Sequence, residues 1–174
     1  MPGFTPQVVP ASERDVPVIA TLAQRIWRAY YPAIISEDQI EYMLAMMYSR
    51  DVLLEELRGP IRYDRLLEGD EFVGFASYGP TEQRACFKLH KLYLLPERHR
   101  RGLGSFLLQH CEVQARRLGA NRIVLNVNKG NARALAFYRK NGFGVAQSLV
   151  LDVGGGFVMD DYVMEKEIGG MAQP

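Results

Sequence analysis

Hydrophobic residues in the first third of the chain recur at every third or fourth position. Val16, Ile19 and Ala23 begin one such series, which ends before Pro32. This spacing places the apolar side chains on one face of a helix, and a serine ahead of the series is suited to cap it. The pattern predicts a short strand and three helical segments, at residues 8–10, from Ser12 to about Tyr30, from Ser36 onward and at about 51–57.

After Gly59-Pro60 the hydrophobic residues form runs that suit strands, with two helical stretches among them. A turn signal at residues 68–70 joins the first two strands into a hairpin. The hairpin spans residues 61–79 and is followed by a long strand at 85–95. A helix at 103–118, a strand at 122–127 and a helix at 131–142 come next, and two strands at 144–153 and 157–168 end the series. This order predicts a mixed α/β (α+β) fold with its β-α-β crossovers in the second half.

The composition, with 48% hydrophobic and 24% charged residues, is typical of a soluble globular protein. A chain of 174 residues has room for one domain with a real core. We therefore expect a single domain over residues 1–174, ordered over about 8–168, with a tail at 169–174. The formal net charge of +1 indicates no general affinity for nucleic acid or membranes, so neither is an expected partner.

Cysteine content and the N-terminus both favour a cytoplasmic location. Cys86 and Cys111 are too few for a disulfide framework and suit a reducing compartment. The first residues lack the charged, apolar and cleavage regions of a signal peptide, and no segment has 18 consecutive apolar residues.

The stretch LYLLPERHRRGLG leads from the long strand into a helix and gathers positive charge at a bend. Helix N-terminal N–H groups lack partners and stabilise an anion. Gly102 and Gly104 have no Cβ and would let a pyrophosphate approach the main chain. Arg98, Arg100 and Arg101 add charge that can bind phosphate oxygens. The stretch predicts an anion site, with a solvated basic turn as the alternative.

Two common nucleotide-binding loops do not fit this stretch. A Walker loop needs Gly-Lys followed by Ser or Thr, and the chain has no such match. The dinucleotide fingerprint needs a third glycine three residues after Gly104, where Leu107 stands. The spacing excludes both motifs.

A second motif, NARALAFYRKNGF, follows the next strand. Ala134, Phe137 and Tyr138 share one helical face in it. A core helix with purely packing aromatics is one interpretation. Together and in this order, the two motifs resemble those of the Gcn5-related N-acetyltransferase (GNAT) superfamily, over residues 62–168 in sequence and 8–58 in layout.

The resemblance implies a GNAT fold, with a mixed sheet of about seven strands that splays between the fourth and fifth and is flanked by about four helices. It also implies acetyl-CoA as co-substrate, with backbone groups of the splayed strand on its pantetheine arm and the loop on its pyrophosphate. The implied cofactor-binding residues are Leu92, Tyr93, Leu94, His99, Arg100, Arg101, Gly102, Leu103, Gly104, Ser105, Asn131, Ala134 and Phe137. His99 stands where relatives usually have Gln or Arg, so a side-chain contact from it is open.

For catalysis, the resemblance implies direct attack of an amine on the thioester. Tyr138 matches the tyrosine that protonates the departing thiolate. In water that transfer is uphill by about 2 kcal/mol, and exclusion of water from the thiolate could offset it. A backbone N–H near Leu94 would stabilise the developing oxyanion.

The base that deprotonates the amine has several candidates. Asn126 stands where some branches have Glu, and Lys88 stands where others have a carboxylate. His90, two residues on and on the same face, is the catalytic candidate we select. One alternative is that His90 is a half-buried strand residue that transfers no proton. Another is that water removes the proton from the amine. No residues have metal-ligand spacing, so no metal is expected.

The acceptor is expected to be a small-molecule or peptide amine. The sequence looks closest to the spermidine/spermine acetyltransferase-like branch, so a polyamine is the first candidate, followed by a protein α-amine or a small amino compound. Tyr30 and Tyr31 could shape its site, while Asp38 and Glu41 would suit a cationic acceptor. The alternative function is that of a non-catalytic CoA-binding sensor or partner subunit. Because dimers are common in the family, the resemblance also implies a possible homodimer.

Overall fold

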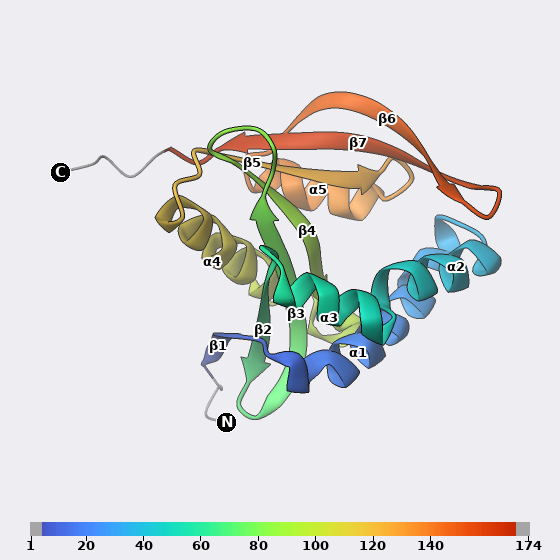
Figure 1. Cartoon of the computed structure of the whole chain (residues 1–174), viewed down its shortest axis with the longest axis horizontal. Coiled ribbons are helices and arrows are strands. Elements are labelled where there is room, and N and C mark those ends of the chain that lie inside the picture. Colours follow the sequence, from blue (N-terminus) through green and yellow to red (C-terminus); the bar gives the residue numbers. More distant parts are fainter. Residues whose placement is uncertain (1–4, 170–174) are drawn as a thin grey trace.

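Seven strands form one mixed sheet in the order β1-β2-β3-β4-β5-β7-β6 (Figure 1). The computed structural model describes residues 5–169. The strands are β1 (Pro6–Pro10), β2 (Arg62–Glu68), β3 (Glu71–Pro80), β4 (Cys86–Leu94), β5 (Arg122–Asn128), β6 (Gly144–Gly154) and β7 (Phe157–Glu167). The helices are α1 (Val16–Tyr30), α2 (Glu37–Tyr48), α3 (Arg50–Arg58), α4 (Leu103–Arg117) and α5 (Ala132–Lys140), with 3₁₀ turns at 13–15, 31–33 and 96–98.

Local caps explain where several helices begin. Ser36 Oγ accepts a hydrogen bond from Gln39 N at 3.2 Å, and Asn131 Oδ1 accepts one from Ala134 N at 3.0 Å. Each bond satisfies an N–H that has no partner inside its helix. Ser12 caps the 3₁₀ turn that leads into α1 rather than α1 itself. Ser36 and Asn131 thus cap α2 and α5 at the starts predicted for these helices.

The parallel strands β4 and β5 pair only at their start. Residues 86–88 face residues 122–124 in register, and beyond that point the two strands separate (Figure 1). β5 continues on its other side against β7, and β4 against β3. The predicted splay between the fourth and fifth strands is confirmed.

The centre of the sheet is covered on both faces. β3 is buried without interruption from Val73 to Gly79, as expected for a strand between two layers. α4 packs against β3 and β4, while α1 contacts β4 and α3 contacts β2. Both cysteines lie free in this buried interior.

The predicted order of strands and helices is confirmed. The helix predicted from the hydrophobic pattern at about 51–57 is α3, so the described residues contain five α-helices, where the resemblance implied about four. None of the described helices is long and apolar enough to cross a membrane. The tail expected at 169–174 lies outside the described residues from residue 170 onward.

Candidate active site

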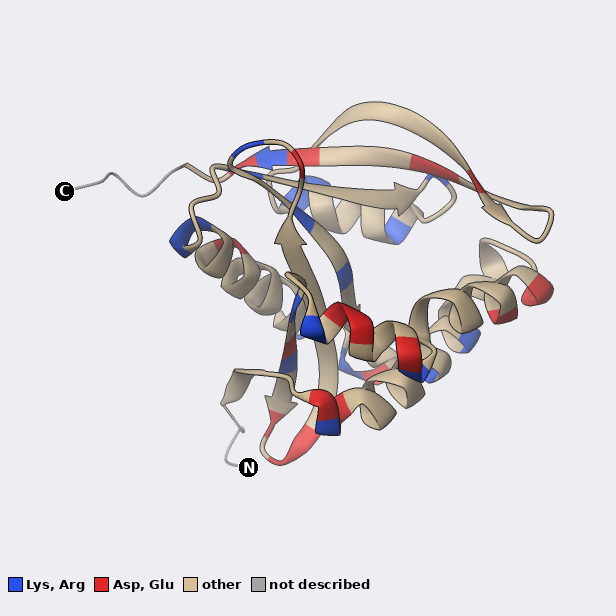
Figure 2. Ribbon diagram, in the orientation of Figure 1, with Lys and Arg blue, Asp and Glu red and all other residues tan. Residues whose placement is uncertain are grey.

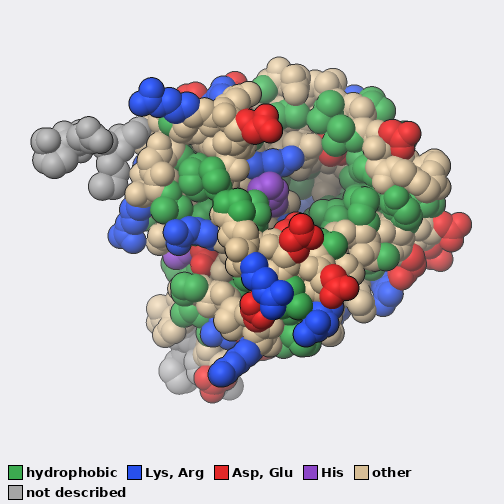
Figure 3. All heavy atoms as spheres, viewed as in Figure 1, with side chains coloured by type: hydrophobic (Ala, Val, Ile, Leu, Met, Phe, Trp, Pro, Cys, Tyr) green, Lys and Arg blue, Asp and Glu red, His purple; other side chains and the backbone are tan. Residues whose placement is uncertain are grey.

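The separation of β4 and β5 opens a cavity of about 640 Å³. Residues from α1, α2, α3, α4, α5 and the β6–β7 hairpin complete its walls. Figure 3 shows the molecule hollowed here, with hydrophobic side chains around the opening and a lysine or arginine and a histidine beside it. The sequence-derived residues that line the cavity are His90, Leu92, Tyr93, Leu94, His99, Arg100, Gly102, Gly104, Ser105, Asn131, Ala134, Phe137 and Tyr138.

Two of the implied cofactor-binding residues do not line this cavity. The side chain of Leu103 is buried in the core, since the residue is only 5% exposed. Arg101 turns away from the cavity to Glu68. Their main-chain N–H groups belong to the loop described next.

The loop before α4 presents a row of free N–H groups. No backbone N–H from residue 100 to residue 105 donates to a protein acceptor within the described residues. Arg100 has φ +62° and Gly102 has φ +79°, so the chain turns twice through the left-handed region before α4 begins. Such a turn directs successive N–H groups to one side and, with the positive end of the helix dipole, forms a site for an anion.

The two glycines of the loop serve different purposes. A Cβ on Gly102 would meet no atom within 4 Å, so its role is the positive φ and an open approach to the backbone. A Cβ on Gly104 would lie 3.2 Å from the ring of Phe137 and 3.4 Å from a methyl of Leu94. The missing Cβ of Gly104 therefore makes room for Phe137 and Leu94, and because Gly104 also lines the cavity its contact with a pyrophosphate stays a prediction.

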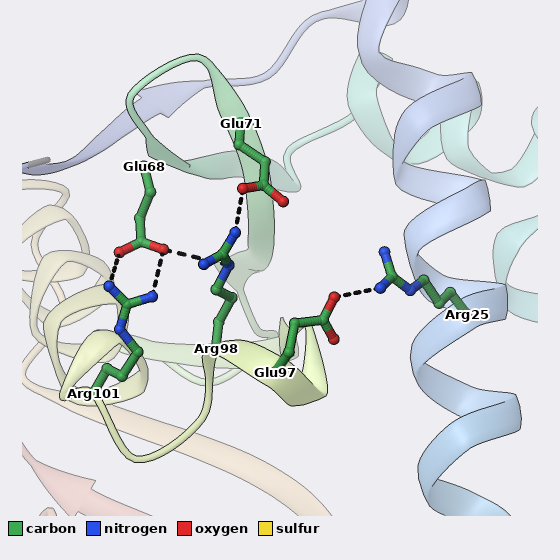
Figure 4. A network of polar contacts seen from close by, with 6 residues as sticks. All are labelled: Arg25, Glu68, Glu71, Glu97, Arg98 and Arg101. Carbon is green, nitrogen blue, oxygen red and sulfur yellow. Dashed lines mark hydrogen bonds and ion pairs between the residues drawn. The ribbon is translucent and has the colours of Figure 1, made fainter.

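Two of the three loop arginines are held by the β2–β3 hairpin, whose turn carries acidic residues (red in Figure 2). Arg101 Nη2 lies 2.9 Å from Glu68 Oε1, and Arg98 Nε lies 3.5 Å from Glu68 Oε2. Arg98 also contacts Glu71 (Figure 4). The expectation that all three guanidinium groups bind phosphate is thus unsupported for Arg98 and Arg101, whereas Arg100 lines the cavity without an ion-pair partner among the described residues.

The edge of β4 that faces the cavity carries unpaired backbone groups. Leu95 N donates to Val73 O next to the pair formed by Leu94 and Gly74, which makes that pair non-hydrogen-bonded. The N–H and C=O of Leu94 therefore point away from β3. The carbonyl is bonded by His99 Nε2 at 3.0 Å, while the N–H has no acceptor among the described residues. His99 thus contributes a side-chain contact to the protein itself.

α5 brings Asn131 and Tyr138 to the same cavity. Asn131 is buried, and its Oδ1 also accepts a hydrogen bond from Tyr30 Oη at 2.8 Å. Tyr138 packs edge-on between Phe137 and Phe143, with ring centroids 5.1 and 5.6 Å away. Burial raises the pKa of the Tyr138 phenol above its ordinary value, and Tyr31 and Cys111 raise it further. The phenol is therefore neutral at pH 7 and can act only as a proton donor.

His90 lies on β4 beside Lys88, and both line the cavity. The register between β3 and β4 skips one residue here, which places His90 in a bulge. Its Nε2 is buried without a hydrogen-bond partner in the described structure. Burial, followed by the charges of Lys88 and Lys91, lowers the pKa of His90 to about 4. The imidazole is neutral at pH 7 but a weak base.

Asp161, on β7, also lines the cavity, and the sequence analysis missed it. Its side chain is buried, and Oδ1 has no hydrogen-bond partner in the described structure. The signal for it was the pair Asp160-Asp161 within a strand, because alternation directs only one of two neighbours inward. Asp160 is the exposed one and pairs with Lys129.

The far end of the cavity is bounded by aromatic and methionine side chains. Trp27 and Tyr31 stack there with ring centroids 4.1 Å apart. α2 supplies Met43, Met46 and Met47. Tyr30 and Tyr31 line the cavity as expected, whereas Asp38 and Glu41 do not, and Glu41 pairs with Arg28 on the surface.

Hydrogen bonds hold α2 against the β6–β7 hairpin at this end. Tyr42 Oη donates to Val153 O at 2.7 Å, and Gln39 Nε2 donates to Val158 O at 2.7 Å. These contacts close the cavity between elements that are more than 100 residues apart in sequence. Within the described residues, no group of three or more His, Cys, Asp or Glu side chains is placed to hold a metal ion.

Comparison with known proteins agrees with this geometry. Residues 20–143 match the acetyltransferase (GNAT) family. The chain is 30% identical over 161 residues to spermidine N(1)-acetyltransferase of Thermoplasma acidophilum, covering 90% of this chain and 93% of that protein. It is also 30% identical over 155 residues to an uncharacterised N-acetyltransferase of Mycobacterium tuberculosis, covering 88% and 98% of the two chains.

Among solved structures, the fold matches the PaiA N-acetyltransferase of Thermoplasma acidophilum, which was crystallised in complex with coenzyme A. The TM-score is 0.80 at 27% identity, over 94% of this chain and 99% of that one. The ribosomal-protein-S18-alanine N-acetyltransferase of Escherichia coli shares the fold with a TM-score of 0.73 at 19% identity, over 97% of each chain.

Proposed function

Because the chain belongs to the acetyltransferase (GNAT) family, we propose that it transfers an acetyl group from acetyl-CoA to the nitrogen of a primary amine. As a member of this family it is an acetyl-CoA-dependent N-acyltransferase. The observation that carries the specific proposal is the joint placement of three features on one cavity. These are the free N–H groups at residues 100–105, the free N–H of Leu94 and the phenol of Tyr138.

The residues present fit acetyl-CoA by their chemistry. A diphosphate needs several donors on one side, and the loop before α4 offers six N–H groups with no competing protein acceptor in the described structure. An extended amide-containing arm suits the unpaired edge of β4, where it can pair like an additional strand. Arg100, Arg133 and Lys140 supply positive charge at the cavity wall. Bound acetyl-CoA would supply the thioester.

Leu94 and Tyr138 would act on two different atoms of the thioester, its carbonyl oxygen and its sulfur. The Leu94 N–H would donate to the thioester oxygen, where negative charge develops during attack by the amine. Tyr138 would donate its proton to the departing sulfur. Its raised pKa opposes this transfer, so the proton would move only as negative charge develops on the sulfur, in surroundings that exclude water from the thiolate as well.

A polyamine is the acceptor that the relative's name suggests, and it stays a prediction. The charges of the cavity favour an amine with one positive charge. Six basic residues line the cavity, Lys88, Lys91, Arg98, Arg100, Arg133 and Lys140, and only two acidic ones, Glu56 and Asp161. Glu56 is already bound by Lys91, at 2.5 Å, and by Tyr63. One unpaired carboxylate matches one ammonium group better than two or three.

The test is thiol release from acetyl-CoA with a panel of amines that includes spermidine, spermine, simple monoamines, amino acids and an N-terminal peptide. We expect one amine class to be turned over by the wild type, and Tyr138→Phe to reduce kcat at least about a hundredfold. Acetyl-CoA affinity, measured by calorimetry, should change less than about threefold in that variant. A wild type that binds acetyl-CoA but acetylates no amine would favour the sensor alternative, which Asn126 at the position of a family carboxylate mildly supports.

Cytoplasmic location and a homodimer also remain predictions. β6 is one of the two edge strands of the sheet and exposes Val150. A long edge strand of this kind is suited to contact a second copy. Light scattering on the purified protein would measure the oligomeric state.

A further inference from the structure

Asp161 is a buried carboxylate whose charge has no direct partner among the described residues. The residue is 5% exposed and lines the cavity, and its Oδ1 is buried without a hydrogen-bond partner in the described structure. A buried carboxylate is normally paired or hydrogen-bonded, because removing it from water is unfavourable. Such an arrangement is expected where a ligand supplies the missing partner.

The groups around Asp161 leave it charged but weakly stabilised. Its sheet neighbours are Asn128 on β5 and Leu149 on β6, both uncharged. Burial is the main effect that raises its pKa, to about 6, and the adjacent Asp160 adds to it. Lys88 from β4 and Lys129 after β5 oppose the rise without forming an ion pair with it. Tyr31, from the turn after α1, is the other titratable group within electrostatic range.

We propose that Asp161 binds the ammonium group of the acceptor and accepts the proton that it must lose before it attacks the thioester. The proposal rests on the proposed acetyl transfer and adds the group that initiates it. Asp161 and Tyr138 line the same cavity, and Tyr31, which also lines it, lies within electrostatic range of both.

The step balances as follows. The ammonium nitrogen gives one proton to Asp161 and forms a bond to the acetyl carbon, and the carbon–sulfur bond breaks. The sulfur takes the proton of Tyr138, and the second proton lost by the nitrogen replaces it through water. Asp161 then releases its proton to solvent. One amide, one free thiol and one proton are the net products.

Asp161 suits this task better than His90. Proton uptake by His90 would create a third positive charge beside Lys88 and Lys91, and its lowered pKa reflects this. Proton uptake by Asp161 instead removes an unfavourable buried charge. Because the pKa of Asp161 lies above that of His90, Asp161 is the stronger proton acceptor of the two.

The test compares Asp161→Asn with Asp160→Asn, because the neighbouring aspartate is 54% exposed and lies outside the cavity lining. Thiol release is measured from pH 6 to pH 9 with the amine that the wild type uses best. Asp161→Asn should lower kcat about a hundredfold at pH 7, and the loss should shrink toward pH 9 as more amine is already neutral. Asp160→Asn should stay within about threefold, and acetyl-CoA affinity should be unchanged in both.

Trp27, the single tryptophan, lines the cavity and provides a readout that does not need turnover. Binding of a monoamine to the CoA complex is followed by its fluorescence at pH 7. We expect the wild type and Asp160→Asn to bind and Asp161→Asn to bind at least about tenfold more weakly. The binding measurement separates the proposed acetyl transfer from the role of Asp161. A wild type that binds amines but does not acetylate them would refute acetyl transfer and leave ammonium binding by Asp161 supported.

The assignment to Asp161 is overturned by any of three results. One is a kcat for Asp161→Asn within about threefold of the wild type at pH 7. Another is equal amine binding by the two proteins, or no amine binding by either. The third is a pH-dependent loss of kcat that occurs in His90→Gln and not in Asp161→Asn.

Discussion

Glu68 and Arg101 form an ion pair of 2.9 Å that joins the β2–β3 hairpin to the loop before α4, 33 residues away along the chain. Glu68 is nearly buried and also holds Arg98 (Figure 4). Arg100 lies between these two anchored arginines with φ +62°, a conformation that costs about 1 kcal/mol or more for a residue other than glycine. The hairpin therefore stabilises the backbone turn that exposes the N–H groups.

Glu68→Gln is expected to weaken CoA binding although Glu68 lies outside the cavity lining. Loss of its charge releases Arg98 and Arg101 and lets the turn at Arg100 relax, at an expected cost of about 1 to 2 kcal/mol in CoA binding. Calorimetric titration with CoA measures the change. Glu97→Gln is the matched control, because Glu97 pairs with Arg25 of α1 at an exposed position. Equal or tighter binding by Glu68→Gln would refute the positioning role.

Gly102→Glu is expected to abolish CoA binding and leave the fold intact. A Cβ at this position meets no protein atom within 4 Å, so the side chain starts in open space and we expect the core to be undisturbed. The added carboxylate would repel an anion beside the free N–H groups, and affinity should fall at least about a hundredfold, or 2.7 kcal/mol.

Gly102→Ala separates charge from backbone strain. It carries the same positive-φ penalty, about 1 kcal/mol, without the charge, and should weaken CoA binding only slightly. Thermal unfolding monitored by circular dichroism checks that both variants are folded. Similar affinities for the two variants would show that strain, and not an anion site, explains the effect.

Tyr42→Phe is expected to affect the acceptor and not the cofactor. The substitution removes the 2.7 Å hydrogen bond to Val153 O, and with it about 0.5 to 1.5 kcal/mol that holds α2 on the β6–β7 hairpin. KM for the amine should rise about threefold to tenfold. Acetyl-CoA affinity, measured separately, should be unchanged, and a parallel loss of both would place Tyr42 in general stability instead.

The pH dependence of stability should reveal His90 and Asp161 as opposing groups. The folded-state pKa of His90, about 4, lies below its ordinary 6.5, so the unfolded chain binds more protons between these values and stability rises with pH. The folded-state pKa of Asp161, about 6, lies above its ordinary 3.8, so the folded chain binds more protons in that window and stability falls as pH rises. Because both groups are partly screened by water, we expect about 1 to 2 kcal/mol from each.

Urea unfolding at pH 4.5 and pH 7 measures these contributions. Asp161→Asn should be more stable than the wild type at pH 7 and gain more stability between the two pH values. His90→Gln should gain less than the wild type over the same range. A wild type and two variants with equal pH dependence would show that neither group is perturbed as described.

The amino-acid sequence alone determined the features that arise from neighbouring residues. Asn131 caps α5 because its side chain needs to reach only three residues ahead, to Ala134 N. The N–H groups of residues 103–105 are free because a helix cannot bond its own first turn, whatever surrounds it. The order of strands and helices follows from hydrophobic period in the same local way.

The tertiary structure decided what distant residues do to these features. Glu68 selects which arginines can face an anion, because a hairpin far away in sequence folds beside the loop. Packing against Phe137 and Leu94 leaves no room for a side chain at Gly104. The pairing of β3 with β4 places His90 in a bulge. The packing of β7 buries Asp161 and leaves Asp160 exposed. Burial and pairing depend on contacts between elements far apart along the chain, and no local pattern of residues encodes them.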